Sequence, residues 1–282
     1  MCKGMELVDN LEKYVKRYRT FDEPVPYKGI GIYPIITKDY FQFIESVDIL
    51  KIEKNKIPDI NIIQMSYLSF LLHLIIENED FLNKFIILCN LCLHVNSSSD
   101  LLNKNFPKGQ VLLGRSNGDE IYFINGYDIQ FINSGNSTWI SINGERLSSI
   151  EFDEVIEIIF FQNFPSYDNE EMSDDFKNML EEYYRLKNKN IKPPTLEEQL
   201  VAIMSQNGMS KAEIKQETIY TIKSMIDSIV SKTDYEIQHL YRSHAMTDKK
   251  LPDIEHWLIK SNKDKYSEVF SDLDEYKKNF EI

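Results

Sequence analysis

The chain has 282 residues, of which 42% are hydrophobic and 12% aromatic. This supply of apolar side chains is enough for a packed core and excludes a globally disordered protein. The formal net charge of −13 and the pI of about 4.9 disfavour binding to nucleic acid or to an anionic membrane, because phosphate groups would repel such a surface.

Cysteine usage and hydropathy indicate an intracellular protein. The three cysteines, Cys2, Cys89 and Cys92, are too few and odd in number for a disulfide framework. The N-terminal residues lack the apolar core of a signal peptide. The most apolar stretch, residues 57–95, is interrupted by charged and amide side chains and contains no run of about 18 apolar residues. We therefore expect a cytoplasmic protein.

The N-terminal segment predicts a short helix followed by a hairpin. Residues 1–24 form a polar leader in which apolar residues recur at helical spacing, and Pro24 ends the helix. Residues 25–36 are rich in β-branched and aromatic side chains and predict a hairpin with its turn near Lys28-Gly29. A helix over residues 40–50 follows, with Thr37 or Asp39 as its N-cap.

Residues 61–94 are apolar on nearly every helical face and predict two buried helices joined at residues 77–80. The next segment, residues 109–146, predicts an antiparallel β-meander. Its short apolar stretches are divided by the turn dipeptides Asn117-Gly118, Asn125-Gly126, Ser134-Gly135 and Asn143-Gly144. We expect the apolar side chains of the meander to form one face: Leu112, Ile121, Phe123, Ile129, Phe131, Trp139, Ile140 and Ile142.

The rest of the chain predicts helices. The capping box Ser148-x-x-Glu151 opens a helix that runs to residue 163, and a polar helix follows over residues 173–187. Residues 187–194, rich in Lys, Asn and Pro, predict a linker. Beyond it we expect helices at 195–207, 210–229 and 235–246, then a short helix around Trp257 and an acidic tail.

These elements predict an α+β fold with a mainly helical body over residues 25–190, preceded by the leader at 1–24. A small antiparallel β-meander is inserted into the body at about 109–146, and a C-terminal helical lobe with the acidic tail covers residues 191–282.

Three residues could bind zinc: Cys89, Cys92 and His94. Two thiolates and an imidazole are suitable ligands, but a tetrahedral site needs a fourth, and no second ligand pair lies nearby in the sequence. Inside a helix, a spacing of three places both thiols on one face among isoleucine and leucine neighbours. Since buried cysteine is a common small hydrophobic residue, we prefer a core position for both.

The sequence contains none of the usual catalytic signatures. The five histidines are scattered, and no His-Glu-x-x-His motif, nucleophile elbow or phosphate-binding loop occurs. Gly29-Ile30-Gly31 lacks the third glycine of a dinucleotide loop. We therefore expect a non-enzymatic protein without a cofactor that acts by binding other proteins.

A helix-turn-helix is the main alternative for residues 195–229, where two predicted helices flank Asn207-Gly208. A DNA-reading helix should offer basic and amide side chains to the major groove. The second helix begins with mixed charge over residues 211–217, which favours a helical hairpin instead. Candidate contact residues for a protein partner are the aromatics Tyr33, Tyr67, Trp139 and Trp257. For Trp257 the preferred interpretation is that it anchors the tail on its own domain.

The order of five segments resembles proteins of the tail modules of phages and prophages of Gram-positive hosts. The segments are VPYKGIGIYPIITKDYFQF, IPDINIIQMSYLSFL, EFDEVIEIIFFQN, PPTLEEQLVAIMSQNGMSKAEI and IEHWL. They extend over residues 25–260 and are similar to tail assembly chaperones and baseplate hub assembly proteins, although the insert at 109–146 is longer than expected for that group.

The resemblance implies a non-enzymatic protein of the host cytoplasm or the virion tail. Its partners would be tape-measure or baseplate hub proteins, and its oligomeric state is left open. Two further alternatives are a DNA-binding regulator and a phage protein that binds a host factor.

Overall fold

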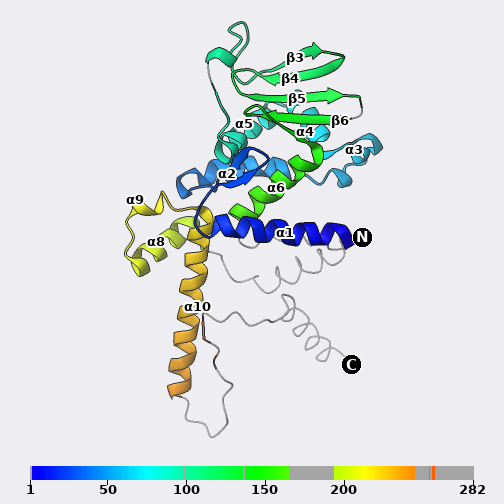
Figure 1. The fold of residues 1–282 in the computed structure, drawn as a ribbon. Helices are drawn as coiled ribbons and strands as arrows, with labels where there is room; N and C mark the ends of the chain where they lie inside the picture. The colour runs from blue at the N-terminus through cyan, green and yellow to red at the C-terminus, as the bar shows by residue number, and fades with distance from the viewer. Residues whose placement is uncertain are drawn as a thin grey trace. The chain divides into compact units, whose positions relative to one another are not determined.

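A computed structural model describes residues 2–97, 99–135, 137–164 and 194–244, together with residues 254, 256 and 257 (Figure 1). The fold is α+β, as predicted. The chain forms two compact units, one from residues 1–167 with 211–222 and the other from residues 168–210 with 223–282. The expected C-terminal lobe at 191–282 is therefore not contiguous, because residues 211–222 belong to the first unit.

The first unit begins with helix α1 (Cys2–Arg19) and a hairpin of strands β1 (Val25–Tyr27) and β2 (Ile30–Ile32). The predicted turn at Lys28-Gly29 is confirmed, since both residues adopt positive φ angles, 48° and 84°. This is the conformation of a two-residue type I′ turn, in which glycine carries no steric penalty. Helix α1 packs against helix α6 with Val15 fully buried.

A layer of helices follows the hairpin. It consists of η1 (Thr37–Asp39), α2 (Tyr40–Val47), η2 (Asp48–Lys51), η3 (Lys54–Lys56), α3 (Ile60–Gln64), α4 (Tyr67–Glu77) and α5 (Glu79–Leu93). The two buried helices expected at 61–94 correspond to α4 and α5, and Asn78 caps α5 by accepting hydrogen bonds from the next backbone amides. The expected side-chain cap of α2 is wrong, because Asp39 makes no capping hydrogen bond.

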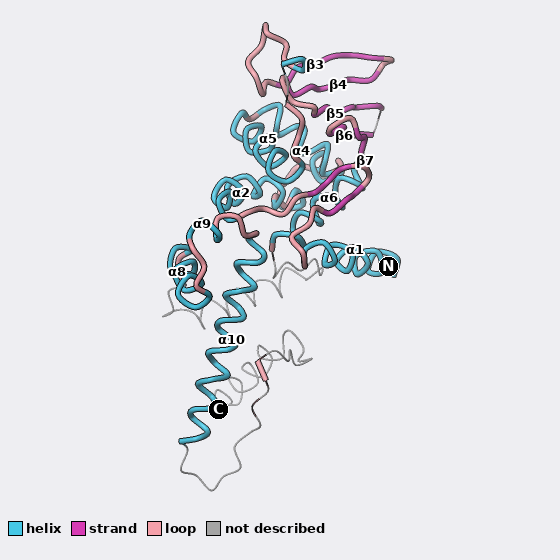
Figure 2. The backbone as a smooth tube through the Cα atoms, turned by 60° about the vertical axis from the view of Figure 1, so that its left-hand side comes forward, coloured by secondary structure: helices cyan, strands magenta, loops and turns pink. Residues whose placement is uncertain are grey.

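After η4 (Ser99–Leu101), five strands form an antiparallel meander in the order β3-β4-β5-β6-β7. Their bounds are β3 (Val111–Ser116), β4 (Asp119–Ile124), β5 (Ile129–Ser134), β6 (Ser137–Ile142) and β7 (Glu145–Ser148). The turns at Asn117-Gly118 and Asn143-Gly144 have two successive positive φ angles, as the sequence predicts. Figures 1 and 2 show helices α4, α5 and α6 on the same side of this sheet.

Asn125 does not form the predicted two-residue turn. Its φ angle is not positive, and its buried side chain binds the loop that precedes β3. The amide nitrogen donates to the carbonyls of Asn103, Phe106 and Pro107 at 2.9–3.2 Å, and the amide oxygen accepts from the backbone N–H of Asn103 at 2.7 Å. An amide side chain here satisfies loop carbonyls that would otherwise lack partners away from water.

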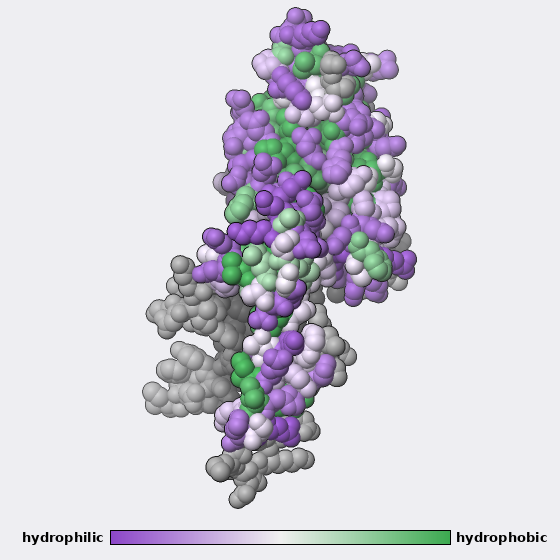
Figure 3. Space-filling view, turned by 90° about the vertical axis from the view of Figure 1, so that its left-hand side faces the viewer, coloured by the Kyte–Doolittle hydropathy of each residue, from purple (hydrophilic) through white to green (hydrophobic). Residues whose placement is uncertain are grey.

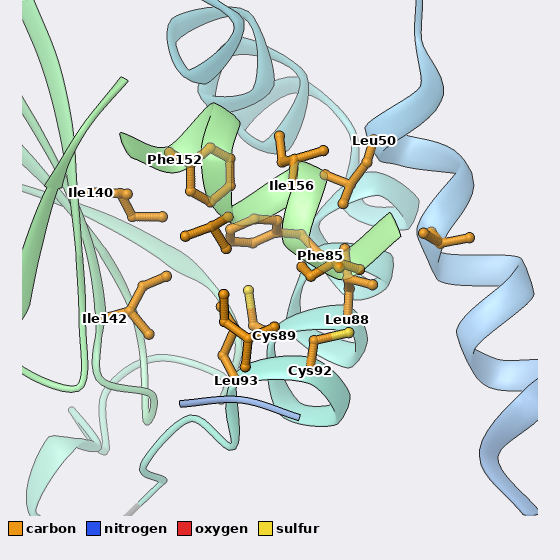
Figure 4. Close-up of a cluster of buried hydrophobic side chains, with 14 of the residues drawn as sticks. Leu50, Phe85, Leu88, Cys89, Cys92, Leu93, Ile140, Ile142, Phe152 and Ile156 are labelled. Carbon is orange, nitrogen blue, oxygen red and sulfur yellow. The ribbon is translucent and has the colours of Figure 1, made fainter. Parts of the chain in front are cut away.

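Helix α6 (Ser149–Asn163) opens with the predicted capping box and contacts both α4 and the strands β6 and β7. In Figure 4, Ile140 and Ile142 of the sheet, Phe152 and Ile156 of α6, and the α5 side chains point toward one another. One continuous core therefore joins the sheet, α5 and α6. Burial of this apolar surface is the main stabilising contribution to the fold.

Backbone hydrogen bonds join residues 211–222 to the rest of the first unit. The N–H of Thr37 donates to the carbonyl of Glu217 and the N–H of Ile219 donates to the carbonyl of Ile35, both at 2.8 Å. The carboxylate of Asp22 accepts hydrogen bonds from the hydroxyls of Thr218 and Thr221.

The helices of the C-terminal part are α8 (Leu196–Asn207), α9 (Lys211–Ile214) and α10 (Ile219–His244). The capping box of Thr195 with Glu198 and the stop at Gly208 are confirmed. Two expectations are wrong. The helix expected at 210–229 is interrupted between α9 and α10, and the separate helix expected from 235 is a continuation of α10.

Several expected segments lie outside the described residues: the polar helix at 173–187, nearly all of the linker at 187–194, and the acidic tail. In the part of the chain that the structure describes, no helix is both long enough and apolar enough to cross a bilayer.

Candidate interaction surface

The five-stranded sheet has two apolar faces, where the sequence pattern suggested one. Directly paired residues of antiparallel strands lie on the same face. The inner face carries Phe131 and Ile140, which pair with each other, and both are buried against the helices. The opposite side chains form a second apolar surface, which we call the outer face: Leu112, Ile121, Phe123, Ile132 and Trp139.

The outer face is continuous across four strands. Ile132 of β5 pairs with Ile121 of β4 on one side and with Trp139 of β6 on the other. Leu112 of β3 pairs with Phe123 of β4. All five side chains are partly exposed in the structure, so each retains surface that a partner could bury.

Gly114 gives the Phe123 ring its place on the outer face. A Cβ atom at Gly114 would lie 2.8 Å from Cε2 of Phe123, closer than carbon atoms approach without a shift. The ring therefore covers the bare backbone of β3, which fills the space that a missing side chain leaves on a strand.

Charged side chains are rare on the outer face, although 27% of the residues in the chain are charged. Among the outward positions of the five strands as described, only Asp119 and Arg146 carry charge. The guanidinium carbon of Arg146 lies 4.5 Å from the ring centroid of Trp139, in cation–π contact. A partner could therefore cover most of this face without removing a charge from water, which would be costly.

Cys89 and Cys92 lie in the core, as preferred from the sequence. Both thiols are buried, and Cys89 borders an apolar cavity of about 10 Å³ that side chains of α5 and α6 line (Figure 4). Burial raises the pKa of both thiols, which disfavours the thiolate form that binds metals.

His94 is not directed toward the two thiols. It ends α5 in a left-handed conformation, is exposed, and stacks on Tyr33 with ring centroids 3.6 Å apart. Partial burial lowers its pKa. Within the described ranges, no three His, Cys, Asp or Glu residues are placed to hold a metal ion.

The four aromatic candidates lie on different elements. Tyr33 stacks on His94, and the Tyr67 hydroxyl donates to the carbonyl of Ile49 at 2.8 Å while burial raises the pKa of Tyr67 to about 12. Trp257 is partly exposed and stacks on His256. Of the four, only Trp139 belongs to the outer face.

Ile132 was not expected at the surface, and Leu112, Ile121, Phe123 and Trp139 were expected on the same face as the core. The signal was present in the alternation of strand side chains. Adjacent residues of a strand point to opposite faces, so Trp139 cannot share a face with Ile140, and its paired residue Ile132 lies on the outer face with it.

The second helix expected for a helix-turn-helix, at residues 210–229, is interrupted. Residues 211–217 contain only the four-residue helix α9, and the backbone of Lys215 and Glu217 is hydrogen-bonded to Lys38 and Thr37. A recognition helix must instead present a continuous exposed face to the major groove.

Comparisons with protein-family models, with curated proteins and with solved structures found no match.

Proposed function

We propose that the protein is a non-enzymatic assembly factor of a phage tail or baseplate, and that it binds its partner protein through the outer face of the five-stranded sheet. The observation that carries the binding role is the second apolar face of this sheet. A soluble sheet normally has one face packed on the core and one polar face toward water. Five apolar side chains on the solvent side lower the solubility of the protein unless a partner covers them.

Trp139 is the expected centre of the contact, and Arg146 on the edge strand β7 lies beside it at the rim. Tryptophan and arginine are enriched among residues that dominate binding free energies, particularly where they lie in a desolvated centre. Here the two side chains are already stacked, so little conformational freedom is lost on binding. The hydroxyl of Ser141, which pairs with Arg146 across the sheet, can bind polar groups of a partner at the rim.

The assignment to tail assembly rests on the resemblance of five segments between residues 25 and 260 to tail assembly chaperones and baseplate hub assembly proteins. The expected partners are tape-measure or hub proteins, and the expected location is the host cytoplasm or the virion tail. The acidic charge supports a chaperone role, because self-repulsion keeps a complex with an apolar client soluble.

The test is a pull-down of tape-measure and hub proteins from phage-producing cells with the full chain as bait. The outer-face variant combines Trp139→Ala with Ile132→Ser, and the matched control is Phe21→Ser, which replaces an exposed aromatic residue outside the sheet. We expect wild type and control to capture a tail protein, and the outer-face variant to capture at least about tenfold less, since losing a central Trp costs 2 kcal/mol or more.

Each outcome of the pull-down has a separate meaning. Capture of neither tail protein above background refutes the assembly role. Equal capture by the outer-face variant refutes the outer face as the contact surface but leaves the assembly role standing. Mass spectrometry of purified virions then distinguishes a structural component, which is present in them, from a chaperone, which is absent.

A further inference from the structure

Helix α10 carries an apolar stripe that continues beyond its first turn, residues 219–222, which belongs to the first unit. The helix has 26 residues, a length of about 39 Å. Ile219 and Ile222 are buried, whereas Val230, Ile237, Leu240 and Tyr241 are 52–73% exposed. Figure 3 shows hydrophobic side chains, drawn in green, at the surface of this helix. An amphipathic helix draws most of its stability from packing of its apolar face, so this face should be covered in solution.

Four isoleucine and leucine residues of the stripe are spaced symmetrically about Thr233. The half-buried Ile226 and Ile229 lie seven and four residues before Thr233, and the exposed Ile237 and Leu240 lie four and seven residues after it. A helix with this pattern matches a second copy of itself when the two run antiparallel. Thr233 then faces Thr233 of the other copy, Ile229 faces Ile237, and Ile226 faces Leu240. Self-complementarity of this kind is what an isologous two-fold interface requires.

The charges beside the stripe are also self-complementary. Residues 223–244 contain three basic side chains, Lys223, Lys232 and Arg242, and three acidic ones, Asp227, Asp234 and Glu236. This helix is therefore neutral although the whole chain has a net charge of −13, so two copies can approach along it without repulsion. In the antiparallel arrangement, Lys232 of one helix faces residue 234 of the other. Glu236 of that second helix is two residues further along, a shift of about 3 Å, and lies on the same side of the helix pair as Lys232.

The opposite side of α10 is occupied by residues of its own chain. Tyr235 contacts His239 and His256 with ring centroids 4.3 and 5.2 Å apart, and His256 stacks on Trp257. Tyr235 lies roughly 160° around the helix from Thr233 at 100° per residue. Among the residues that the structure describes, Thr233, Ile237 and Leu240 on the other side of α10 remain exposed, so a second copy can cover them.

We propose that the protein forms a homodimer in which two α10 helices pack antiparallel about a two-fold axis at Thr233. The expected mass in sedimentation velocity at micromolar concentration is that of a dimer. Ile237→Glu places a charge in the stripe and should raise the dimer dissociation constant at least about tenfold, the equivalent of 1.4 kcal/mol. The matched control Ser231→Glu places the same charge at an exposed position on the far side of α10 and should leave the dimer intact.

A charge-swap series tests the flanking pair. Lys232 and Glu236 also form an ion pair of 3.9 Å within one helix, so the test mixes two single variants. Lys232→Glu chains should dimerise with Glu236→Lys chains better than either variant dimerises with itself, because only the mixed dimer places opposite charges across the interface. Circular dichroism confirms that each variant keeps its helix content. A monomeric wild type, or a dimer indifferent to Ile237→Glu, overturns the proposal.

Cysteine cross-linking tests the helix direction in a Cys2→Ser background, with Cys89 and Cys92 buried. Thr233→Cys should cross-link with itself. Leu240→Cys alone should not, but a mixture of Leu240→Cys and Ile226→Cys chains should, because these positions face each other only when the helices run antiparallel. Cross-linking of Leu240→Cys alone would indicate parallel helices and overturn the arrangement.

Discussion

The side chain of Asn163 joins two segments that are 128 residues apart in the sequence. Its Oδ1 accepts a hydrogen bond of 2.8 Å from the backbone N–H of Ile35, and its Nδ2 donates to the carbonyl of Ile159 at 2.9 Å. Asn163 is fully buried. The amide thus ties the end of α6 to the segment after β2 and gives the buried N–H of Ile35 its partner, which an apolar side chain could not do.

Asn163→Ala should lower the free energy of unfolding by about 1–3 kcal/mol, because it leaves the buried N–H of Ile35 without an acceptor. Urea unfolding followed by circular dichroism measures the change. Asn83→Ala, at an exposed position of α5, is the control and should stay within about 0.5 kcal/mol of wild type. A loss no larger than that of the control would show that Ile35 finds another acceptor.

The elements set by local chemistry could be predicted from the sequence. The Asn-Gly turns, the capping boxes at Ser148 and Thr195, and the helical periods of α4, α5 and α6 all depend on residues within a few positions of one another. The burial of Cys89 and Cys92 followed from their spacing on an apolar helix.

The long-range contacts could not be predicted. In them, side-chain amides form hydrogen bonds with backbone groups of distant loops, and nothing near the amide in the sequence indicates which loop it binds. Asn125 satisfies the loop before β3, and Asn143 accepts from the N–H of Asn96, 47 residues away. Each resembles an ordinary turn residue in the sequence. The break between α9 and α10 is of the same kind, since the backbone at Glu217 pairs with Thr37 rather than continuing a helix.

Substitution of two neighbours on β5, Phe131 and Ile132, should lower stability by very different amounts because the two side chains lie on opposite faces of the sheet. Phe131 is buried beside Phe85, with ring centroids 5.6 Å apart, so Phe131→Ala should cost about 3–5 kcal/mol of unfolding free energy. Ile132→Thr retains β-branching at a partly exposed position and should cost less than about 1 kcal/mol. Thermal and urea unfolding of the two variants decide the matter, and equal losses would mean that the outer face is packed inside the protein.

Cys89 and Cys92 should resist thiol reagents in the native protein. Burial raises the pKa of both thiols, and reagents need both the thiolate and access to it. In a Cys2→Ser variant, labelling at pH 8 should be slow and should reach two thiols per chain only after unfolding in urea. Rapid native labelling of either cysteine would show that the α5–α6 core opens locally without global unfolding.

The capping box of α6 should make the free energy of unfolding depend on pH in the acid range. Backbone and hydroxyl hydrogen bonds from Ser148, each 2.9 Å long, and the Lys28 ammonium at 3.1 Å lower the pKa of Glu151 from its ordinary 4.5 to about 2. Because the folded-state pKa lies below the unfolded one, the contribution of Glu151 is fully present above pH 4.5. It is lost as the pH falls from about 4.5 to about 2.

The Glu151→Gln variant should therefore have its unfolding midpoint at a lower urea concentration than wild type at pH 7. The midpoints of the two proteins should converge as the pH is lowered to about 2.5. The physical reason is that protonation removes from wild type the charge-assisted contacts that the variant never had. The control is Glu45→Gln, at an exposed position of α2. Its urea midpoint should change with pH in the same way as that of wild type across this range. If the Glu151→Gln midpoint instead stays a constant distance below wild type at every pH, the capping contact does not depend on the charge of Glu151.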